Sequence, residues 1–279
     1  MSITILDGPL GTALSDLGVP TPAPLWSAAA LTTHPGVIAD IHRAHVRAGA
    51  TVHTANTFRT TRRAAGADWR RLTQSAVDLT RSVLPPSHRL AGSIAPLEDC
   101  YSPERSPSDP GPEHALLAEA LVAAGCDLLL CETFPHIAEG LAAVEVAVQA
   151  ASATGAEVWV SFTAGYRADL LTPDEIARGA RFAVERGADA VLVNCIPARD
   201  TLRYVERLAD LGVPFGAYAN AGHPTDGLGW ASTDQGPTRY ADIAQTWVDA
   251  GATLIGSCCG TSAATTAELA RRFNPLEKT

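Results

Sequence analysis

Short apolar segments rich in Val, Ile and Leu recur along the chain, and stretches with apolar positions at helical spacing separate them. This alternation predicts parallel strands joined by helices. Eight strands are predicted, at Ile3–Leu6, Thr51–Thr54, Leu90–Ile94, Asp127–Cys131, Glu157–Phe162, Ala190–Asn194, Pro214–Tyr218 and Thr253–Ile255.

Helices are predicted between these strands, and most of them end at a glycine. The sequence Thr172-Pro173-Asp174-Glu175 is a helix N-terminal signature and opens a helix that stops at Gly187. Glycines in Ala-Gly-Ala and Gly-Ala-Asp sequences before several strands predict left-handed helix C-caps. The other predicted helices are His34–Ala48, Trp69–Val83, Glu113–Ala124, His136–Ala153, Asp200–Leu211 and Tyr240–Ala250.

Eight strand–helix units in 279 residues fit a single (β/α)8 TIM barrel, which typically needs about 250 residues. A doubly wound open sheet is the alternative, but Gly8-Pro9-Leu10-Gly11 after the first strand does not fit its G-x-G-x-x-G spacing. No shift in composition marks a boundary, so one domain is predicted over residues 1–279. In such a barrel the active site lies at the C-terminal strand ends.

Composition narrows the function classes. The formal net charge of −9 disfavours binding to the phosphate backbone of nucleic acids. No apolar segment reaches the length of a membrane span and no signal peptide is visible, so a cytoplasmic location without a membrane partner is expected. Six cysteines in a cytosolic chain of this length do not form a disulfide framework.

Three cysteines follow two of the predicted strands. Cys195 ends the sixth strand, and Cys258 and Cys259 follow the eighth, so all three converge on one mouth of the barrel. Three thiolates with one open position are typical of a catalytic zinc site. Packing as small buried side chains is the alternative, and we expect it for Cys100, Cys126 and Cys131. For the three convergent cysteines, the adjacent pair in a glycine-rich strand end favours the metal.

The chain resembles the homocysteine S-methyltransferase family. The motifs that carry the resemblance arrive in family order and span nearly the whole chain. They are Leu6-Asp7-Gly8-Pro9-Leu10-Gly11-Thr12, Leu25-Trp26-Ser27, Ala55-Asn56-Thr57-Phe58, Gly92-Ser93-Ile94-Ala95-Pro96, Cys131-Glu132-Thr133, Val193-Asn194-Cys195, Ala219-Asn220-Ala221-Gly222 and Ile255-Gly256-Ser257-Cys258-Cys259-Gly260-Thr261.

The resemblance implies a (β/α)8 barrel with Zn²⁺ held by Cys195, Cys258 and Cys259. It implies that the thiolate of homocysteine becomes the fourth zinc ligand and takes a methyl group to give methionine. Asp7 and Glu132 match the family's homocysteine-binding acids, and each can accept charge-assisted hydrogen bonds from the substrate ammonium.

Further residues of these motifs are candidates for the substrate site. Backbone N–H groups of the turn at Gly8 could hold the substrate carboxylate, and Ser27 matches a family hydroxyl that does so, with a helix cap as its alternative role. Asn56, Asn194 and Asn220 are expected either to cap turns or to donate N–H···S bonds to the thiolates.

The methyl donor is expected to be a sulfonium, S-methylmethionine or S-adenosylmethionine. Trp26 and Phe58 could hold its positive charge on their rings or else pack as core. Arg59 could pair with a donor carboxylate, with a solvated loop position as its alternative. Betaine or a separate corrinoid protein is the alternative methyl source. A non-catalytic zinc- or thiol-binding protein and a redox protein cycling Cys258 and Cys259 are the rival functions. The sequence leaves the oligomeric state open.

Overall fold

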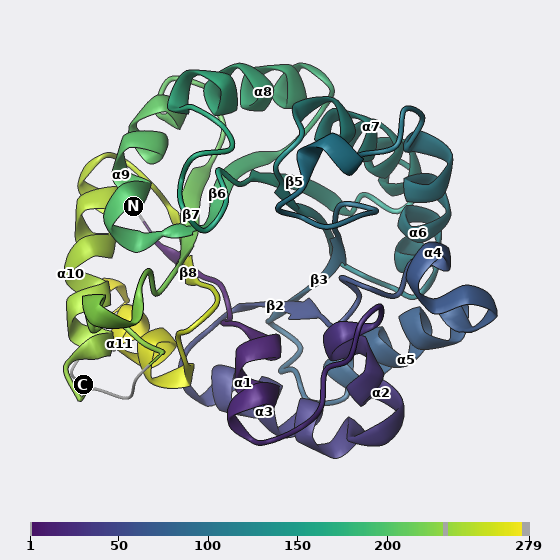
Figure 1. Cartoon of the computed structure of the whole chain (residues 1–279), viewed down its shortest axis with the longest axis horizontal. Coiled ribbons are helices and arrows are strands. Elements are labelled where there is room, and N and C mark those ends of the chain that lie inside the picture. The colour runs from purple at the N-terminus through teal and green to yellow at the C-terminus, as the bar shows by residue number, and fades with distance from the viewer. Residues whose placement is uncertain (1, 231–233, 275–279) are drawn as a thin grey trace.

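Eight parallel strands form a ring surrounded by helices (Figure 1). The computed structural model describes residues 2–230 and 234–274. The strand order β1-β8-β7-β6-β5-β4-β3-β2 leaves β1 and β2 at the two ends of the sheet. A parallel bridge between Leu6 and Val52 joins these ends, and Thr51 N donates to Ile5 O at 2.9 Å. The predicted (β/α)8 barrel is therefore confirmed and the open sheet is excluded.

All eight predicted strands are present. They are β1 (Thr4–Ile5), β2 (Val52–Ala55), β3 (Arg89–Ile94), β4 (Leu128–Phe134), β5 (Glu157–Phe162), β6 (Ala190–Pro197), β7 (Phe215–Asn220) and β8 (Leu254–Ser257). Two of them, β4 and β6, run three residues beyond their predicted C-terminal ends, and these added residues contribute to the cavity described below. The predicted domain of residues 1–279 includes residues 1, 231–233 and 275–279, which lie outside the described part of the chain.

The helices cover the outside of the ring. Those predicted appear as α3 (Pro35–Arg47), α5 (Trp69–Arg81), α6 (Gly111–Ala123), α7 (Ile137–Ala151), α8 (Pro173–Glu185), α9 (Ala198–Val205) and α10 (Gly236–Asp249). The structure adds the helices α1 (Leu10–Asp16), α2 (Ala30–Thr33), α4 (Arg62–Ala65) and α11 (Ala263–Phe273), and short 3-10 turns that include η1 (Trp26–Ala29) and η3 (Pro103–Arg105). Thr172 is the N-cap of α8, as its signature predicts, and forms a capping box with Glu175; Gly49, Gly187 and Gly251 have φ of 93°, 99° and 99°.

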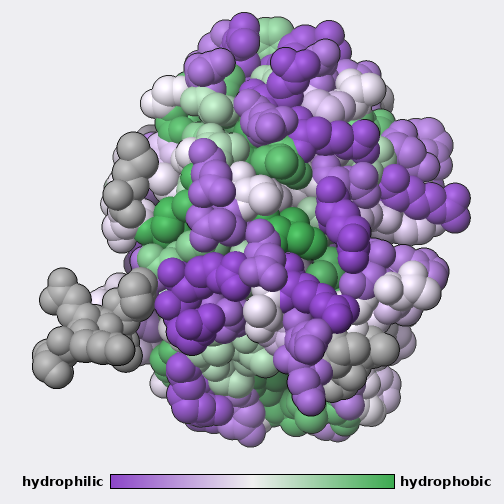
Figure 2. Space-filling model, turned by 90° about the vertical axis from the view of Figure 1, so that its left-hand side faces the viewer, coloured by the Kyte–Doolittle hydropathy of each residue, from purple (hydrophilic) through white to green (hydrophobic). Residues whose placement is uncertain are grey.

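Two apolar layers form the core. Side chains from alternating strand positions, such as Leu128, Leu130 and Leu192, fill the barrel interior, and the other strand face packs against the helices. Among the described residues, no helix combines the length and the apolar character needed to cross a bilayer. The face seen in Figure 2 is mostly hydrophilic, with smaller hydrophobic patches between polar side chains.

Irregular pairing near the C-terminal end of β6 changes the direction of its side chains. Leu192 faces the barrel interior and Val193 faces the helices, so strict alternation would turn Cys195 away from the mouth. The register shifts between Asn194 and Pro197, and Cys195 takes a left-handed φ of 53°. Such a bulge re-aims a side chain, and Cys195 accordingly lines the cavity at the mouth.

Candidate active site

A cavity of about 510 Å³ opens at the C-terminal ends of the strands. This volume falls within the range of small-molecule sites. Its wall combines four cysteines, two carboxylates and several aromatic rings. Among the residues that line it are Asp7, Gly8, Trp26, Ser27, Asn56, Phe58, Ser93, Cys100, Tyr101, Glu132, Cys195, Tyr218, Cys258 and Cys259.

The sulfurs of Cys195, Cys258 and Cys259 form a triangle in this wall. The Sγ–Sγ distances are 3.3 Å for Cys195–Cys258, 3.6 Å for Cys195–Cys259 and 3.8 Å for Cys258–Cys259. These distances exceed the S–S bond length of about 2.05 Å, and all three are free thiols. Tetrahedral coordination with metal–sulfur bonds of about 2.3 Å places sulfurs about 3.8 Å apart. The triangle therefore has the dimensions of three corners of a tetrahedral thiolate site.

Hydrogen bonds between the three sulfurs give the thiols different pKa values. Hydrogen bonds from Cys258 to the other two sulfurs, followed by burial, raise the pKa of the Cys258 thiol. The pKa of Cys259 is lowered because its sulfur accepts hydrogen bonds from Cys195 and Cys258. Cys259 is accordingly the thiol of the triangle that loses its proton first.

Two neighbours hold Cys195. The Tyr101 hydroxyl lies 3.2 Å from Cys195 Sγ, and Asn220 Nδ2 donates to the backbone carbonyl of Cys195 at 2.8 Å. Asn194 Nδ2 donates to Thr133 Oγ1 at 2.7 Å. Among the described residues, no asparagine donates to a cysteine sulfur, so the expected N–H···S bonds are absent there. Asn194 Oδ1 also accepts from Thr133 N at 3.1 Å, where the pairing of β4 shifts register as that of β6 does, so Asn194 and Asn220 bind the backbones of these two irregular strand ends.

Glu132 is a buried carboxylate with two hydroxyl donors. Ser93 Oγ donates to Glu132 Oε1 at 2.5 Å, and Tyr218 Oη donates to Oε2 at 3.0 Å. Burial raises the pKa of Glu132 to about 6, and the two hydroxyl bonds limit that rise. Glu132 is therefore ionised at neutral pH and can accept further hydrogen bonds from a cation in the cavity.

Asp7 lies across the cavity wall from Glu132, just after β1. Its Oδ2 accepts from Thr54 N at 3.0 Å and lies 3.9 Å from His42 Nδ1. Burial raises the pKa of Asp7 to about 8, with a smaller contribution from the charge of Glu132. A cation placed between Asp7 and Glu132 would stabilise the ionised form of both carboxylates.

The turn after β1 and the turn η1 lie beside Asp7. Gly8 has room for no side chain, because a Cβ there would lie 2.6 Å from the ring of the buried His45. Ser27 lies within η1 and does not cap a helix; its Oγ donates to Asn56 Oδ1 at 2.7 Å, and Asn56 Nδ2 returns a bond to Ser27 O at 2.9 Å. The Asn56 amide thus fixes the position of Ser27 at the cavity.

Arg59 supports the aromatic wall of the cavity. The rings of Trp26 and Phe58 stack at 6.1 Å, and the Arg59 guanidinium lies 4.2 Å from the Trp26 ring centroid. Arg59 is only 6% exposed, which corrects the expectation of a solvated loop residue. Its terminal nitrogens donate to the carbonyls of Pro96, Leu97 and Glu98. The guanidinium therefore holds the chain after β3 and is not among the cavity-lining groups.

The segment that carries Tyr101 has a second anchor. Glu139 of α7, which is buried, accepts from Leu97 N at 2.8 Å and from Ser106 Oγ at 2.6 Å. His114 Nε2 lies 3.3 Å from the same carboxylate. Glu139 thus fixes both ends of the segment between Leu97 and Ser106, and Tyr101 lies between them.

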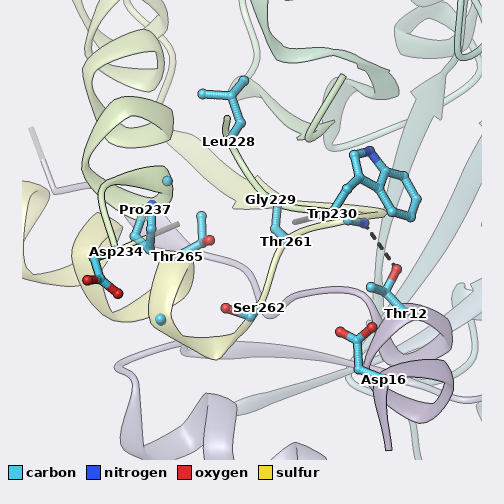
Figure 3. A pocket seen from close by; sticks show the side chains of 13 residues that line it. Thr12, Asp16, Leu228, Gly229, Trp230, Asp234, Pro237, Thr261, Ser262 and Thr265 are labelled. Atoms are coloured by element: carbon cyan, nitrogen blue, oxygen red, sulfur yellow. Dashed lines mark hydrogen bonds between the residues drawn. The ribbon is translucent and has the colours of Figure 1, made fainter. Parts of the chain in front are cut away.

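A second cavity, of about 550 Å³, adjoins the turn that follows the cysteine pair (Figure 3). Thr12 Oγ1 accepts from Gly260 N at 3.1 Å, and Trp230 N donates to Gly260 O at 2.9 Å. Gly260 has φ of 79°, and a Cβ there would lie 2.5 Å from the Trp230 ring. Asp16 and Asp234 also line this cavity. Its wall therefore supports the turn after Cys259 from outside.

Sequence reasoning missed four groups that complete the site. Ser93 and Tyr218 lie within predicted strands, so inward-facing polar positions were the available signal. His42 lies on the apolar face of a predicted helix, so its position there indicates a core residue. Tyr101 lies in a proline-rich segment, and nothing in the spacing marks it.

Known proteins match the chain over nearly its whole length. The family model for homocysteine S-methyltransferase matches residues 4–273. Homocysteine S-methyltransferase of Escherichia coli K12 is 31% identical, covering 97% of this chain and 95% of that protein. Homocysteine S-methyltransferase YbgG of Bacillus subtilis 168 is 27% identical, covering 99% and 96%. The metallated form of the E. coli homocysteine methyltransferase MmuM superposes with a TM-score of 0.79, at 27% identity over 98% of this chain and 96% of that one.

A barrel whose strand ends bring together three thiols and two buried carboxylates, and whose relatives share one named activity, is a methyltransferase that acts on a thiol. The chain belongs to the homocysteine S-methyltransferase family. That family transfers a methyl group to homocysteine.

Proposed function

We propose that the protein transfers a methyl group from a sulfonium donor, S-methylmethionine or S-adenosylmethionine, to the sulfur of homocysteine, with zinc as its metal. The observation that carries the proposal is the triangle of Cys195, Cys258 and Cys259, with sulfurs 3.3–3.8 Å apart. Three cysteines leave one tetrahedral position for a further ligand, which is typical of catalytic zinc. The metallated form of the matched E. coli enzyme supports a metal at this site.

Zinc, when bound by the three cysteines, supplies the acidity that removes the proton of a coordinating thiol. The cysteines hold the net charge of such a site at −1, because three thiolates exceed the charge of the ion by one. A sulfonium donor is positive, so this charge and the carboxylate of Glu132 favour its entry into the cavity.

Asp7 and Glu132 would hold the amino-acid end of homocysteine. Both carboxylates line the same cavity as the three sulfurs, and both can accept from a primary ammonium. Ser93 and Tyr218 orient the Glu132 carboxylate by donating to separate oxygens. Ser27 and the backbone at Gly8 lie where the substrate carboxylate can be bound.

Trp26 and Phe58 would face the donor. A sulfonium is stabilised on an aromatic face in the way that other cations are. The Arg59 guanidinium occupies a position over the Trp26 ring. Arg59 is therefore proposed to support the aromatic wall rather than to pair with a donor carboxylate.

The chemistry requires one bond exchange. The homocysteine sulfur forms a bond to the methyl carbon, and the bond between that carbon and the donor sulfur breaks. The released electron pair stays on the donor sulfur, which becomes a neutral thioether, and the thiol proton leaves to solvent. Because the sulfonium is already an activated leaving group, no acid is needed at the donor.

The test couples two measurements on one preparation. Zinc is quantified per chain, and methionine formation from homocysteine is followed with S-methylmethionine, S-adenosylmethionine and betaine in parallel. One zinc per chain and turnover with a sulfonium support the proposal. Turnover with betaine alone overturns the donor, and zinc without turnover with any of the three donors overturns the proposed reaction.

The rival redox function predicts a protein without a bound metal. If the purified chain binds no zinc and its thiol count falls by two on mild oxidation, the redox function replaces the proposal. Cys126→Ser is a matched control, since Cys126 is buried between sheet and helices, outside the cavity. This variant should retain zinc and activity.

A further inference from the structure

Two buried histidines adjoin Asp7 and are not among the residues that line the active-site cavity. His42 comes from α3 and His53 from β2, and they are 1% and 0% exposed. One Asp7 oxygen, one nitrogen of His42 and one of His53 all lie within 4.8 Å of one another. His42 Nδ1 lies 3.9 Å from Asp7 Oδ2. The proposed function gives these histidines no role.

Hydrogen bonding fixes the tautomer of His42. The single proton of the Thr80 hydroxyl is donated to the carbonyl of Ala76 at 2.8 Å. Thr80 Oγ1 must then accept from His42 Nε2, which lies 3.2 Å away. The proton of the neutral ring is on Nε2, so Nδ1 presents a lone pair toward Asp7.

His53 has the same arrangement. Its Nε2 lies 3.1 Å from the carbonyl of Ala50 and 3.0 Å from His88 Nδ1, and we place the proton on Nε2 because the carbonyl can only accept. Its Nδ1 is an acceptor. Among the described residues, neither His42 Nδ1 nor His53 Nδ1 has a hydrogen-bond partner. Three acceptor groups, two imidazole nitrogens and a carboxylate, thus share one buried space.

The spacing indicates what this space accepts. Metal bonds of about 2.1 Å at right angles would bring ligand atoms to about 3.0 Å, closer than the 3.9 Å between Asp7 and His42. The same 3.9 Å is longer than a direct hydrogen bond, so His42 Nδ1 faces Asp7 with a lone pair and donates nothing to it. The cluster is therefore wider than a metal site of this geometry and gives the Asp7 carboxylate no compensating donor from the histidines.

The surrounding charges favour a proton. The ionisable groups that face the cluster are His45 of α3, His88 before β3 and Glu132 of β4. Burial lowers the pKa of both His42 and His53 to about 3, so neither ring supplies a positive charge. Among the described residues, no lysine or arginine forms an ion pair with Asp7. An ionised Asp7 would thus be a buried charge that is stabilised only by hydrogen bonds from Thr54 and from its own backbone, which is costly.

We propose that the Asp7–His42–His53 cluster is a proton-binding site, in which the Asp7 carboxylate carries one proton beside the histidine lone pairs and releases it when the ammonium of the amino-acid substrate pairs with Asp7. The exchange keeps the buried charge balanced, since a cation arrives as a proton leaves. His53 Nε2 lies 3.0 Å from Nδ1 of the half-buried His88, so the cluster leads toward solvent. This inference rests on the proposed role of Asp7 in binding the substrate ammonium.

Binding of methionine to the zinc-loaded enzyme tests the exchange, because methionine carries the ammonium but no ionisable thiol. Calorimetric titration at pH 7 in two buffers of different ionisation enthalpy counts the protons released. Wild type should release about one proton per methionine bound. Glu132→Gln should bind more weakly and still release it, whereas Asp7→Asn should release none. Binding by wild type without proton release would overturn the inference.

A measurement without ligand separates this inference from the proposed function. The infrared difference between wild type and Asp7→Asn should contain the carbonyl band of one protonated carboxylic acid at pH 6, and the band should vanish by pH 10. Nitrogen-15 spectra should show His42 and His53 protonated on Nε2 only. A missing band, or a proton on His42 Nδ1, overturns the proton site even if methionine fails to bind. Failure of methionine to bind while the band is present counts against the substrate alone.

Discussion

Replacing Glu132 with glutamine removes one negative charge from the cavity and leaves the side-chain volume nearly unchanged. The amide oxygen can still accept from Ser93 at the position where the carboxylate now accepts at 2.5 Å. The amide nitrogen then faces Tyr218, whose hydroxyl must turn to accept instead of donating. The change is therefore local and leaves Asp7 and the cysteine triangle in place.

The magnitude follows from the bond that the substrate loses. A hydrogen bond to a charged group contributes about 1.5–3 kcal/mol. At 1.4 kcal/mol for each factor of ten, the KM for homocysteine should rise about 10- to 150-fold in Glu132→Gln. The burial-raised pKa of Glu132, about 6, adds a pH signature. Below that pH wild type also carries a neutral side chain, so the difference between the two enzymes should shrink.

The assay is initial-rate methionine formation with homocysteine varied at pH 5.5, 7 and 8, together with zinc content. Glu119→Gln removes an exposed carboxylate on α6 and serves as the matched control, with no expected change. An unchanged KM at pH 7 would refute the assignment of Glu132 to the ammonium. Loss of zinc in Glu132→Gln would show that its carboxylate acts on the metal instead.

Three further outcomes are expected. Cys195→Ser should lower the zinc content and abolish turnover, and full activity would refute the ligand assignment. Gly216→Ala should destabilise the fold by several kcal/mol in denaturant unfolding, because the new Cβ would lie 1.7 Å from Leu254 O. The matched Gly36→Ala has open space within helix α3 and should gain about 0.5–1 kcal/mol. Since burial raises the pKa of Asp7 from 3.8 to about 8, the folded state binds its proton more tightly than the unfolded chain. Relative to Asp7→Asn, wild type should therefore lose up to about 1.4 kcal/mol of stability per pH unit between pH 4 and 8, and a constant difference would contradict this.

The alternation of inward- and outward-facing side chains predicts the orientation of the site residue on β4 but not of the one on β6. In β4, inward-facing Leu128 and Leu130 put Glu132 on the inner face by simple alternation. In β6 the same rule turns Cys195 outward, and the bulge that re-aims it is bound by a hydrogen bond from Asn220 of the neighbouring strand. Bulges set by another strand leave no signal in local periodicity, so Cys195 was placed at the mouth by its position at a strand end and not by the alternation of side chains.

Two other groups depend on tertiary contacts alone. Tyr101 reaches Cys195 because Arg59 and Glu139 hold the segment around it, and both anchors lie far from it in sequence. His42 occupies a helix position that reads as core, and only the structure reveals that its ring faces a carboxylate. Residues whose partners come from distant elements carry no spacing that sequence analysis can use.

The two anchors of the Tyr101 segment have a consequence for how the family can diverge. Neither Arg59 nor Glu139 lines the active-site cavity, yet both bind backbone or side chains at the base of this segment. Substitutions between Leu97 and Ser106 therefore change groups that line the cavity, such as Cys100 and Tyr101, and leave the barrel in place. The anchors themselves have no such freedom, because a buried charge deprived of its partners is costly. Substitutions at the tip of the segment should thus be tolerated better than substitutions of the two anchors.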